Sequence, residues 1–114
     1  LLNAGMNDLM RPALYEGYHH ILPLQQSTAQ PVPQEIAGPI CESTDVFAKQ
    51  RMLPPLEEGA KVAFLTAGAY CSVLANHYNG RALPAEVLLT DSGPKLIRPA
   101  VSDADMIALE QAQA

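Results

Sequence analysis

Proline and turn residues divide this chain into short segments. Ten of its 114 residues are proline. Three of these lie in the polar stretch Leu22–Pro33 (LPLQQSTAQPVP), two stand side by side at Pro54–Pro55, and another follows the turn residues Asp91-Ser92-Gly93. Because proline has no backbone N–H and a fixed φ, it interrupts the hydrogen bonding of a helix or strand interior. The sequence therefore predicts a mainly β fold of short strands, a Greek-key-like β-barrel or sandwich with short peripheral helices.

The segments between these turns carry the patterns of short strands and helices. Lys61–Tyr70 (KVAFLTAGAY) has a continuous apolar centre and is expected to be a buried strand. A helix over Pro12–Ile21, with proline in its first turn, would place Leu14, Tyr18 and Ile21 on one face. A strand is expected over Gln34–Cys41, broken at Gly38–Pro39. Asp45–Met52 is expected to form either a short helix capped by Ser43 or Thr44, or a bent strand. The remaining expected elements are a hairpin of Pro84–Thr90 and Lys95–Arg98 and a serine-capped helix over Ser102–Gln113.

The composition argues against several classes of protein. With 48% hydrophobic and 17% charged residues, the chain is expected to form a single domain, residues 1–114. Its net charge of −5 and lack of a basic cluster disfavour nucleic acid as a partner. The apolar stretches are too short for a membrane helix, and no signal-peptide pattern is visible. Cys41 and Cys71 are therefore expected to be reduced thiols in a cytoplasmic protein. No metal site is expected, because the cysteines lack zinc spacing and the adjacent His19–His20 would point about 100° apart on a helix.

Three small clusters combine residues that suit an amino-acid ligand. Arg11 and Tyr15 stand four positions apart at the start of the predicted helix, so both can project to one side. Cys41–Glu42 ends one predicted strand and Tyr70 ends another. Each residue also fits a purely structural role, as a surface charge, a small core residue or a rim aromatic. Spacing and composition alone favour that structural interpretation and leave the functional one open.

Four sequence blocks together resemble the diaminopimelate decarboxylase family and follow one another in the family's order. They are Ala4–Tyr15 (AGMNDLMRPALY), Gly38–Asp45 (GPICESTD), Ala67–Tyr70 (AGAY) and Tyr78–Val87 (YNGRALPAEV). The resemblance extends from about Leu2 to Leu109. Members of this family are alanine-racemase-like, fold type III enzymes that depend on pyridoxal 5'-phosphate (PLP). They convert meso-2,6-diaminopimelate to L-lysine and CO2, the last step of lysine biosynthesis.

The resemblance implies an enzyme larger than this chain. Family members join an N-terminal α/β barrel, which carries PLP on a lysine, to a C-terminal β domain that this chain resembles. They act as homodimers in which the Cys-Glu pair of one subunit faces the barrel of the other. None of Lys49, Lys61 and Lys95 lies in a motif like the family's Schiff-base motif, and the chain begins on Leu1. The chain alone is therefore predicted to be inactive: a portion of a longer enzyme, a partner of a separately encoded barrel, or a decayed remnant.

The resemblance also implies roles for the three clusters. Arg11 and Tyr15 match the family's ligands for a substrate carboxylate, which a guanidinium can bind in a bidentate manner. Glu42 matches the acid that binds the distal ammonium of the substrate, and Tyr70 matches a tyrosine near the cofactor phosphate and the substrate. Cys41 matches the residue that returns a proton to Cα after CO2 leaves. An ordinary thiol suits this role because it is largely protonated near neutral pH.

Two other functions stay open at this point. One is a non-catalytic dimerisation or interaction module with the same fold, and the other is part of a decarboxylase for another basic amino acid. The Cys41-Glu42-Ser43 sequence favours diaminopimelate, because ornithine-type relatives carry a Cys-Asp pair whose acid is one methylene shorter. Cys71 departs from the family, which more often has glycine after the tyrosine, and it is expected to crowd or stiffen that turn.

Overall fold

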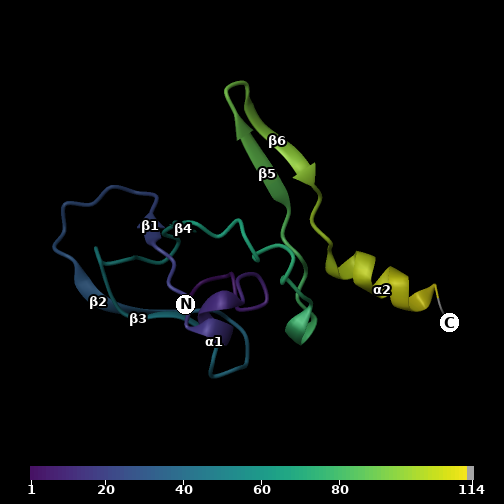
Figure 1. Cartoon of the computed structure of the whole chain (residues 1–114), viewed down its shortest axis with the longest axis horizontal. Coiled ribbons are helices and arrows are strands. Elements are labelled where there is room, and N and C mark those ends of the chain that lie inside the picture. The colour runs from purple at the N-terminus through teal and green to yellow at the C-terminus, as the bar shows by residue number, and fades with distance from the viewer. Residues whose placement is uncertain (113–114) are drawn as a thin grey trace. The chain divides into compact units, whose positions relative to one another are not determined.

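The computed structural model describes residues 1–112 and confirms a mainly β chain with few, short helices (Figure 1). The elements in chain order are α1 (Arg11–Tyr15), β1 (Ile21–Pro23), β2 (Val32–Ala37), β3 (Val46–Leu53), β4 (Val62–Phe64), the 3-10 turn η1 (Tyr78–Gly80), β5 (Glu86–Thr90), β6 (Gly93–Arg98) and α2 (Asp103–Gln111). They form two compact units, residues 1–75 and residues 76–114. The described strands pair as three antiparallel two-stranded sheets, β1–β4, β2–β3 and β5–β6, and do not close into a barrel.

A small apolar core holds the first unit together. Its buried members come from the loop before α1 and from strands β1, β2 and β3: Leu9, Ile21, Ile36, Phe47, Ala48 and Leu53. Strand β4 joins them through Phe64, whose ring centroid lies 4.8 Å from that of Phe47 with the two planes tilted by 49°. Because a sheet of two strands is only marginally stable by itself, the shared core is what stabilises both sheets of this unit.

Helix α1 is shorter than the sequence predicts, so the expected helix over Pro12–Ile21 is wrong beyond Tyr15. Glu16 adopts the left-handed conformation with φ of 54°, which ends the helix. The next backbone N–H, that of Gly17, donates to the Arg11 carbonyl at 3.1 Å. Ile21 instead lies in β1 with 1% of its surface exposed. Burying this side chain in the core outweighs the helical spacing that it shares with Leu14.

The structure also decides the predictions for the segments that form β3 and β4. The segment expected as a helix or a bent strand over Asp45–Met52 is strand β3, so the strand alternative is the correct one. The long buried strand expected over Lys61–Tyr70 is wrong, because β4 spans only Val62–Phe64 and is half-buried. Thr66 and Tyr70 have positive φ angles of 58° and 61°. A left-handed residue cannot continue an extended strand, so the apolar run turns away after Phe64.

The second unit contains the predicted hairpin and the predicted C-terminal helix. Strands β5 and β6 pair through a turn at Asp91-Ser92, where Gly93 takes a φ of 112° that favours glycine. None of the described residues of the second unit is buried. Five apolar side chains of the hairpin each expose about half or more of their surface: Val87, Leu88, Leu89, Leu96 and Ile97.

Helix α2 begins as the sequence predicts. Ser102 caps it through a capping box with Asp105, in which each side chain accepts from the backbone N–H of the other. The helix ends at Gln111, and the last residue predicted to be helical, Gln113, lies outside the described residues. Over residues 1–112, no helix has the length and apolar character to cross a bilayer.

Candidate functional site

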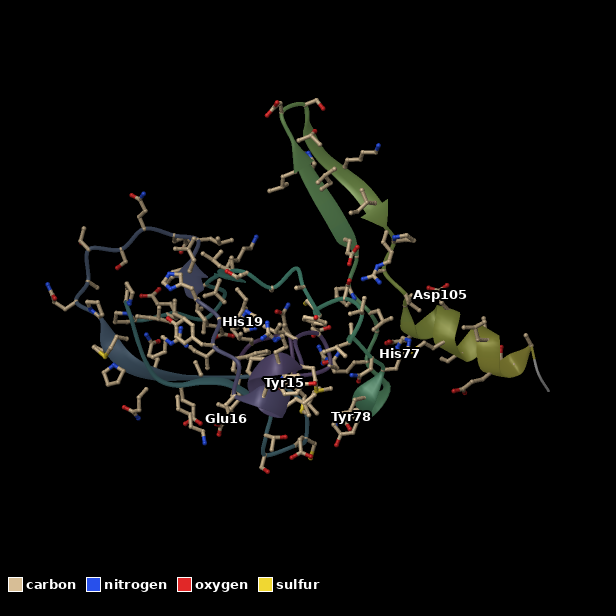
Figure 2. All side chains as sticks on the ribbon, viewed as in Figure 1. Tyr15, Glu16, His19, His77, Tyr78 and Asp105 are labelled. Carbon is tan, nitrogen blue, oxygen red and sulfur yellow. The ribbon has the colours of Figure 1, made fainter. Side chains whose placement is uncertain are left out.

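Hydrogen bonds of side chains hold the loop before α1, which places Arg11 at the start of the helix. The Asp8 carboxylate accepts from the Gly5 backbone N–H at 2.9 Å and from the Asn7 amide at 3.1 Å. Asn7 is completely buried, so this turn packs into the first unit and does not project into solvent. Arg11 is half-buried at the first helical position, and Tyr15 follows on the same helix with 65% of its surface exposed. Figure 2 shows Tyr15 on the short helix α1, next to Glu16.

The structure brings Arg11 and Tyr70 together from distant parts of the first unit. The Arg11 guanidinium carbon lies 6.0 Å from the centroid of the Tyr70 ring, at the outer limit of a cation–π contact. Tyr70 exposes 64% of its surface, and its left-handed backbone turns the chain at this point. The guanidinium offers N–H donors and the accessible phenol offers an O–H donor, and both suit an anionic group. This pair can therefore bind a carboxylate or a phosphate.

Cys41 and Glu42 lie on a separate loop that joins β2 to β3. This loop spans residues 38–45 and is closed at its ends by a hydrogen bond from the Gly38 N–H to the Asp45 carbonyl at 2.9 Å. Within it, the Asp45 N–H donates to the Glu42 carbonyl at 3.0 Å, which makes a tight turn. Ile40 is buried and anchors the loop, whereas Cys41 is exposed and forms no disulfide. The thiol therefore stands at the surface on a well-defined turn.

The Glu42 carboxylate is already held by its own loop. Its Oε1 atom accepts from the Thr44 backbone N–H at 3.2 Å and from the Ser43 hydroxyl at 3.3 Å. The side chain is half-buried. A carboxylate is a negatively charged acceptor, so the chemistry of the Glu42 side chain suits an ammonium group.

Asp45 is a polar residue at this site that sequence reasoning missed. It exposes only 3% of its surface, and both carboxylate oxygens accept backbone N–H groups at 2.7 Å, Oδ1 from Met6 and Oδ2 from Ile40. One signal for it exists in the sequence. An acid placed directly before the apolar run Val46-Phe47-Ala48, which begins a buried strand, is expected to need buried hydrogen-bond partners.

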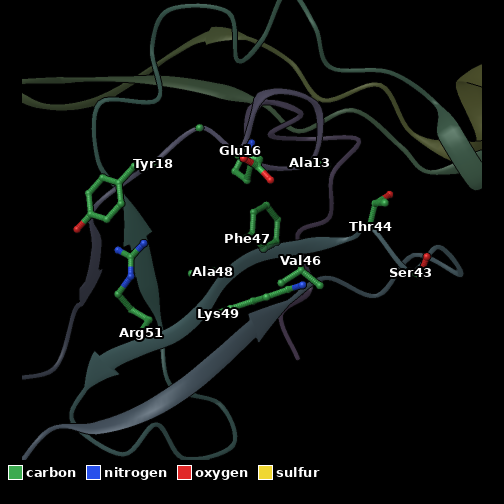
Figure 3. Close-up of a pocket in the computed structure, with 12 residues that line it drawn as sticks. Ala13, Glu16, Tyr18, Ser43, Thr44, Val46, Phe47, Ala48, Lys49 and Arg51 are labelled. Carbon is green, nitrogen blue, oxygen red and sulfur yellow. The ribbon is translucent and has the colours of Figure 1, made fainter.

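A hollow of about 430 Å³ lies between α1 and β3 (Figure 3). Arg51 faces it with its guanidinium carbon 4.3 Å from the Tyr18 ring centroid, and its Nη1 atom donates to the His19 carbonyl at 2.9 Å. Ser43 and Thr44, the residues that follow the Cys41–Glu42 pair, line the same hollow. The hollow therefore borders the loop of the predicted thiol and acid, but its walls do not include those two side chains or Arg11, Tyr15 and Tyr70.

The residues of this chain do not by themselves fit a covalent PLP site. Lys49, Lys61 and Lys95 are the only lysines, and all three are exposed to solvent, two of them on strands and one in a loop. A Schiff-base lysine is typically activated by desolvation, which these exposed positions do not provide, although Lys49 lines the hollow between α1 and β3. What the chain can offer to the phosphate of PLP is the Tyr70 hydroxyl next to the Arg11 guanidinium.

Comparisons with known proteins agree on one kind of relative. Residues 1–68 match the family described as pyridoxal-dependent decarboxylase, C-terminal sheet domain. The chain is 44% identical over 98 residues to the diaminopimelate decarboxylase of Aquifex aeolicus, covering 86% of this chain and 23% of the relative. It is 45% identical over 108 residues to that of Methanocaldococcus jannaschii, covering 95% of this chain and 24% of the relative.

A solved structure shares the same fold. The crystal structure of diaminopimelate decarboxylase from Helicobacter pylori complexed with L-lysine superposes with a TM-score of 0.89 and 39% identity, covering 98% of this chain and 28% of that chain. The chain thus spans about a quarter of the length of the relatives that it matches. The family match includes Arg11, Tyr15, Cys41 and Glu42, while Tyr70 lies just beyond residue 68.

Proposed function

The chain belongs to the pyridoxal-dependent decarboxylases, as their C-terminal sheet domain, and we propose that it is the C-terminal portion of a diaminopimelate decarboxylase. Such an enzyme converts meso-2,6-diaminopimelate to L-lysine and CO2. The observation that carries the proposal is the extent of the similarity, 45% identity over 95% of this chain to a diaminopimelate decarboxylase. The missing length would be the N-terminal α/β barrel, and its absence from this chain makes the chain alone inactive.

The two groups of site residues suit a substrate with charges at both ends. In this proposal, Arg11 and Tyr15 bind a substrate carboxylate, and the adjacent Tyr70 donates its hydroxyl to substrate or cofactor oxygens. Glu42 binds the distal ammonium, while the exposed Cys41 thiol donates a proton to Cα after CO2 has left. PLP, when bound, supplies the electron sink for the charge that decarboxylation leaves. The barrel would make most of the contacts that hold this cofactor.

The family resemblance implies an active site shared between two subunits, and the exposed position of Cys41 is compatible with it. Arg11 and Tyr70 contact one another, whereas Cys41 and Glu42 lie on the loop of residues 38–45. We infer that, in a homodimer, the Cys41–Glu42 loop of one subunit completes the site that contains the barrel of the other. We infer a cytoplasmic location from the resemblance to cytoplasmic enzymes of lysine biosynthesis.

A chimeric enzyme tests this function directly. The C-terminal quarter of the Aquifex aeolicus enzyme would be replaced by residues 1–114, and CO2 release from meso-diaminopimelate would be measured. We expect activity from the chimera and none from the 114-residue chain alone. We expect Cys41→Ala to lower kcat by about 100-fold, the order of a lost general acid. Glu42→Ala should raise KM about 10-fold or more, because a charge-assisted contact is lost.

A surface acid provides the matched control. Glu58 is exposed and outside the proposed site, so Glu58→Ala should leave kcat and KM unchanged. PLP absorbance of the chimera reports that the barrel has folded and loaded. A loaded chimera that dimerises but releases no CO2 would favour the non-catalytic interaction module. Faster turnover of lysine or ornithine than of diaminopimelate would favour a decarboxylase for another basic amino acid.

A further inference from the structure

One buried carboxylate connects two loops that lie far apart in the sequence. Asp45 Oδ1 accepts the Met6 N–H and Asp45 Oδ2 accepts the Ile40 N–H, each at 2.7 Å. Met6 belongs to the loop that precedes Arg11, and Ile40 directly precedes Cys41. We propose that Asp45 is a positioning residue that fixes these two loops relative to each other, and thereby sets where the Cys41 thiol and the Glu42 carboxylate stand.

The surroundings of Asp45 are shaped to hold its carboxylate in this one place. The Gly38 N–H donates to the Asp45 carbonyl, so the main chain on both sides of the loop converges here. Gly38 is itself buried, and its missing side chain leaves the space that the carboxylate fills. A Cβ atom at this position would lie 2.6 Å from Asp45 Cγ. Glycine at position 38 and aspartate at position 45 are therefore complementary.

The chemistry of the contact requires two acceptors, which an aspartate has and its close isosteres lack. Both partners are backbone N–H donors in a part of the chain where Asp45 is 3% exposed. Asparagine would keep one oxygen but present an NH2 group to the other donor, so one N–H would lose its partner. A buried donor without a partner destabilises the arrangement that buries it. An aspartate to asparagine change should therefore release one loop while leaving the side-chain volume almost unchanged.

The link to catalysis rests on the proposed function and is mediated by position alone. Asp45 touches no substrate in this scheme. Its bond to Ile40 fixes the residue immediately before Cys41, and its own N–H bonds to the carbonyl of Glu42. Misplacing a reacting group by about 1 Å can cost on the order of 100-fold in rate. Releasing the loop should therefore impair both the proton donor and the acid that binds the substrate ammonium.

The structural half of this inference can be tested on the unsubstituted 114-residue chain. Through-hydrogen-bond scalar couplings would be measured by NMR between the amide nitrogens and the side-chain carboxyl carbon of Asp45. We expect couplings from both Met6 and Ile40. In Asp45→Asn, amide hydrogen exchange should accelerate at least 10-fold at one or both of these residues, while Asp91→Asn in the exposed hairpin turn should change neither. A missing coupling at either amide of the unsubstituted chain would overturn the inference.

The functional half is tested in the chimeric enzyme. Asp45→Asn should lower kcat/KM by about 10- to 100-fold and raise KM for meso-diaminopimelate, because the Glu42 loop is displaced. A variant that merely folds less well would lower the apparent kcat and leave KM unchanged, and that result would contradict the positioning role. An active chimera that Asp45→Asn does not affect would do the same. An unsubstituted chimera without activity would instead count against the proposed function, and the couplings would still decide whether Asp45 joins the loops.

Discussion

At Gly38 the chain has room for a hydrogen atom and for nothing larger, because the Asp45 carboxylate lies against it. We expect Gly38→Ala to lower the free energy of unfolding by about 1–3 kcal/mol, as overpacking of a filled interior does. Gly68→Ala is the matched control, since nothing lies within 4 Å of an added Cβ there and the backbone φ is not in the left-handed region. Urea unfolding of both variants measures the difference. Equal stability of the two would show that the carboxylate can leave Gly38 at little cost.

Residues differ in how far their surroundings can be predicted from sequence. The sequence blocks that contain Arg11, Tyr15, Cys41, Glu42 and Tyr70 predict these candidates through the family resemblance, and their roles stay predictions. The contact between Arg11 and Tyr70 could not be predicted, because 58 intervening residues must first fold. Asp45 was missed for a similar reason. An acid before an apolar run indicates a need for buried partners, but no local pattern identifies Met6, which lies 39 positions earlier, as one of them.

Among the elements, helix α2 has a pH-sensitive first turn. The Ser102 hydroxyl, at 2.6 Å, and then the Ser102 backbone N–H, at 2.8 Å, hydrogen-bond the Asp105 carboxylate and lower its pKa below the usual value, against a small opposing effect of desolvation. Figure 2 shows Asp105 at the start of this helix. Because the folded-state pKa is the lower one, the capping box stabilises the helix fully above the unfolded pKa of about 3.9 and loses this effect as the pH falls through the folded value.

We therefore expect the first turn of α2 to fray below about pH 4. The 13Cα chemical shifts of Ala104 and Met106 would follow this loss during an acid titration. Asp105→Asn should abolish the dependence, while Asp103→Asn, at the neighbouring exposed acid, should preserve it. Unchanged shifts down to about pH 2 in the unsubstituted chain would contradict the role of the capping box.

Local signals predicted those elements whose ends are set by neighbouring residues. The turn at Asp91-Ser92-Gly93 and the cap at Ser102 both depend on contacts within three positions, and both are confirmed. Helix α1 and strand β4 were predicted too long, because left-handed residues at Glu16 and Thr66 end them. Neither residue type favours that conformation, so a local sequence pattern does not indicate it.

On the scale of the whole molecule, stability is expected to be uneven. All buried residues among those described belong to the unit of residues 1–75, which includes the paired strands β2 and β3. Hydrogen-bonded amides of β5 and β6 should therefore exchange with solvent at least 10-fold faster than those of β2 and β3 in the 114-residue chain. Amide exchange followed by NMR measures this ratio. Equal protection of the two hairpins would show that the exposed side chains of β5 and β6 are covered in solution.

The fold class could be predicted because it depends on features spread along the whole sequence. Frequent prolines and turn residues predict short strands, and four ordered blocks predict the family that the comparisons confirm. The sequence pattern could not predict whether the strands close into a barrel, because closure depends on which strands become neighbours. In the described residues each sheet consists of two strands.

Pairing in twos also leaves each described strand with one edge that no other described strand pairs. In the hairpin of β5 and β6, leucine and isoleucine side chains stand exposed on these strands. Electrostatic repulsion between copies that each carry a net charge of −5 opposes their association. Ionic strength weakens that repulsion, since the screening length falls to about 10 Å at 0.1 M salt. Concentrated, salty solutions of the isolated chain therefore favour intermolecular sheets and aggregation, and a dilute buffer of low ionic strength opposes them.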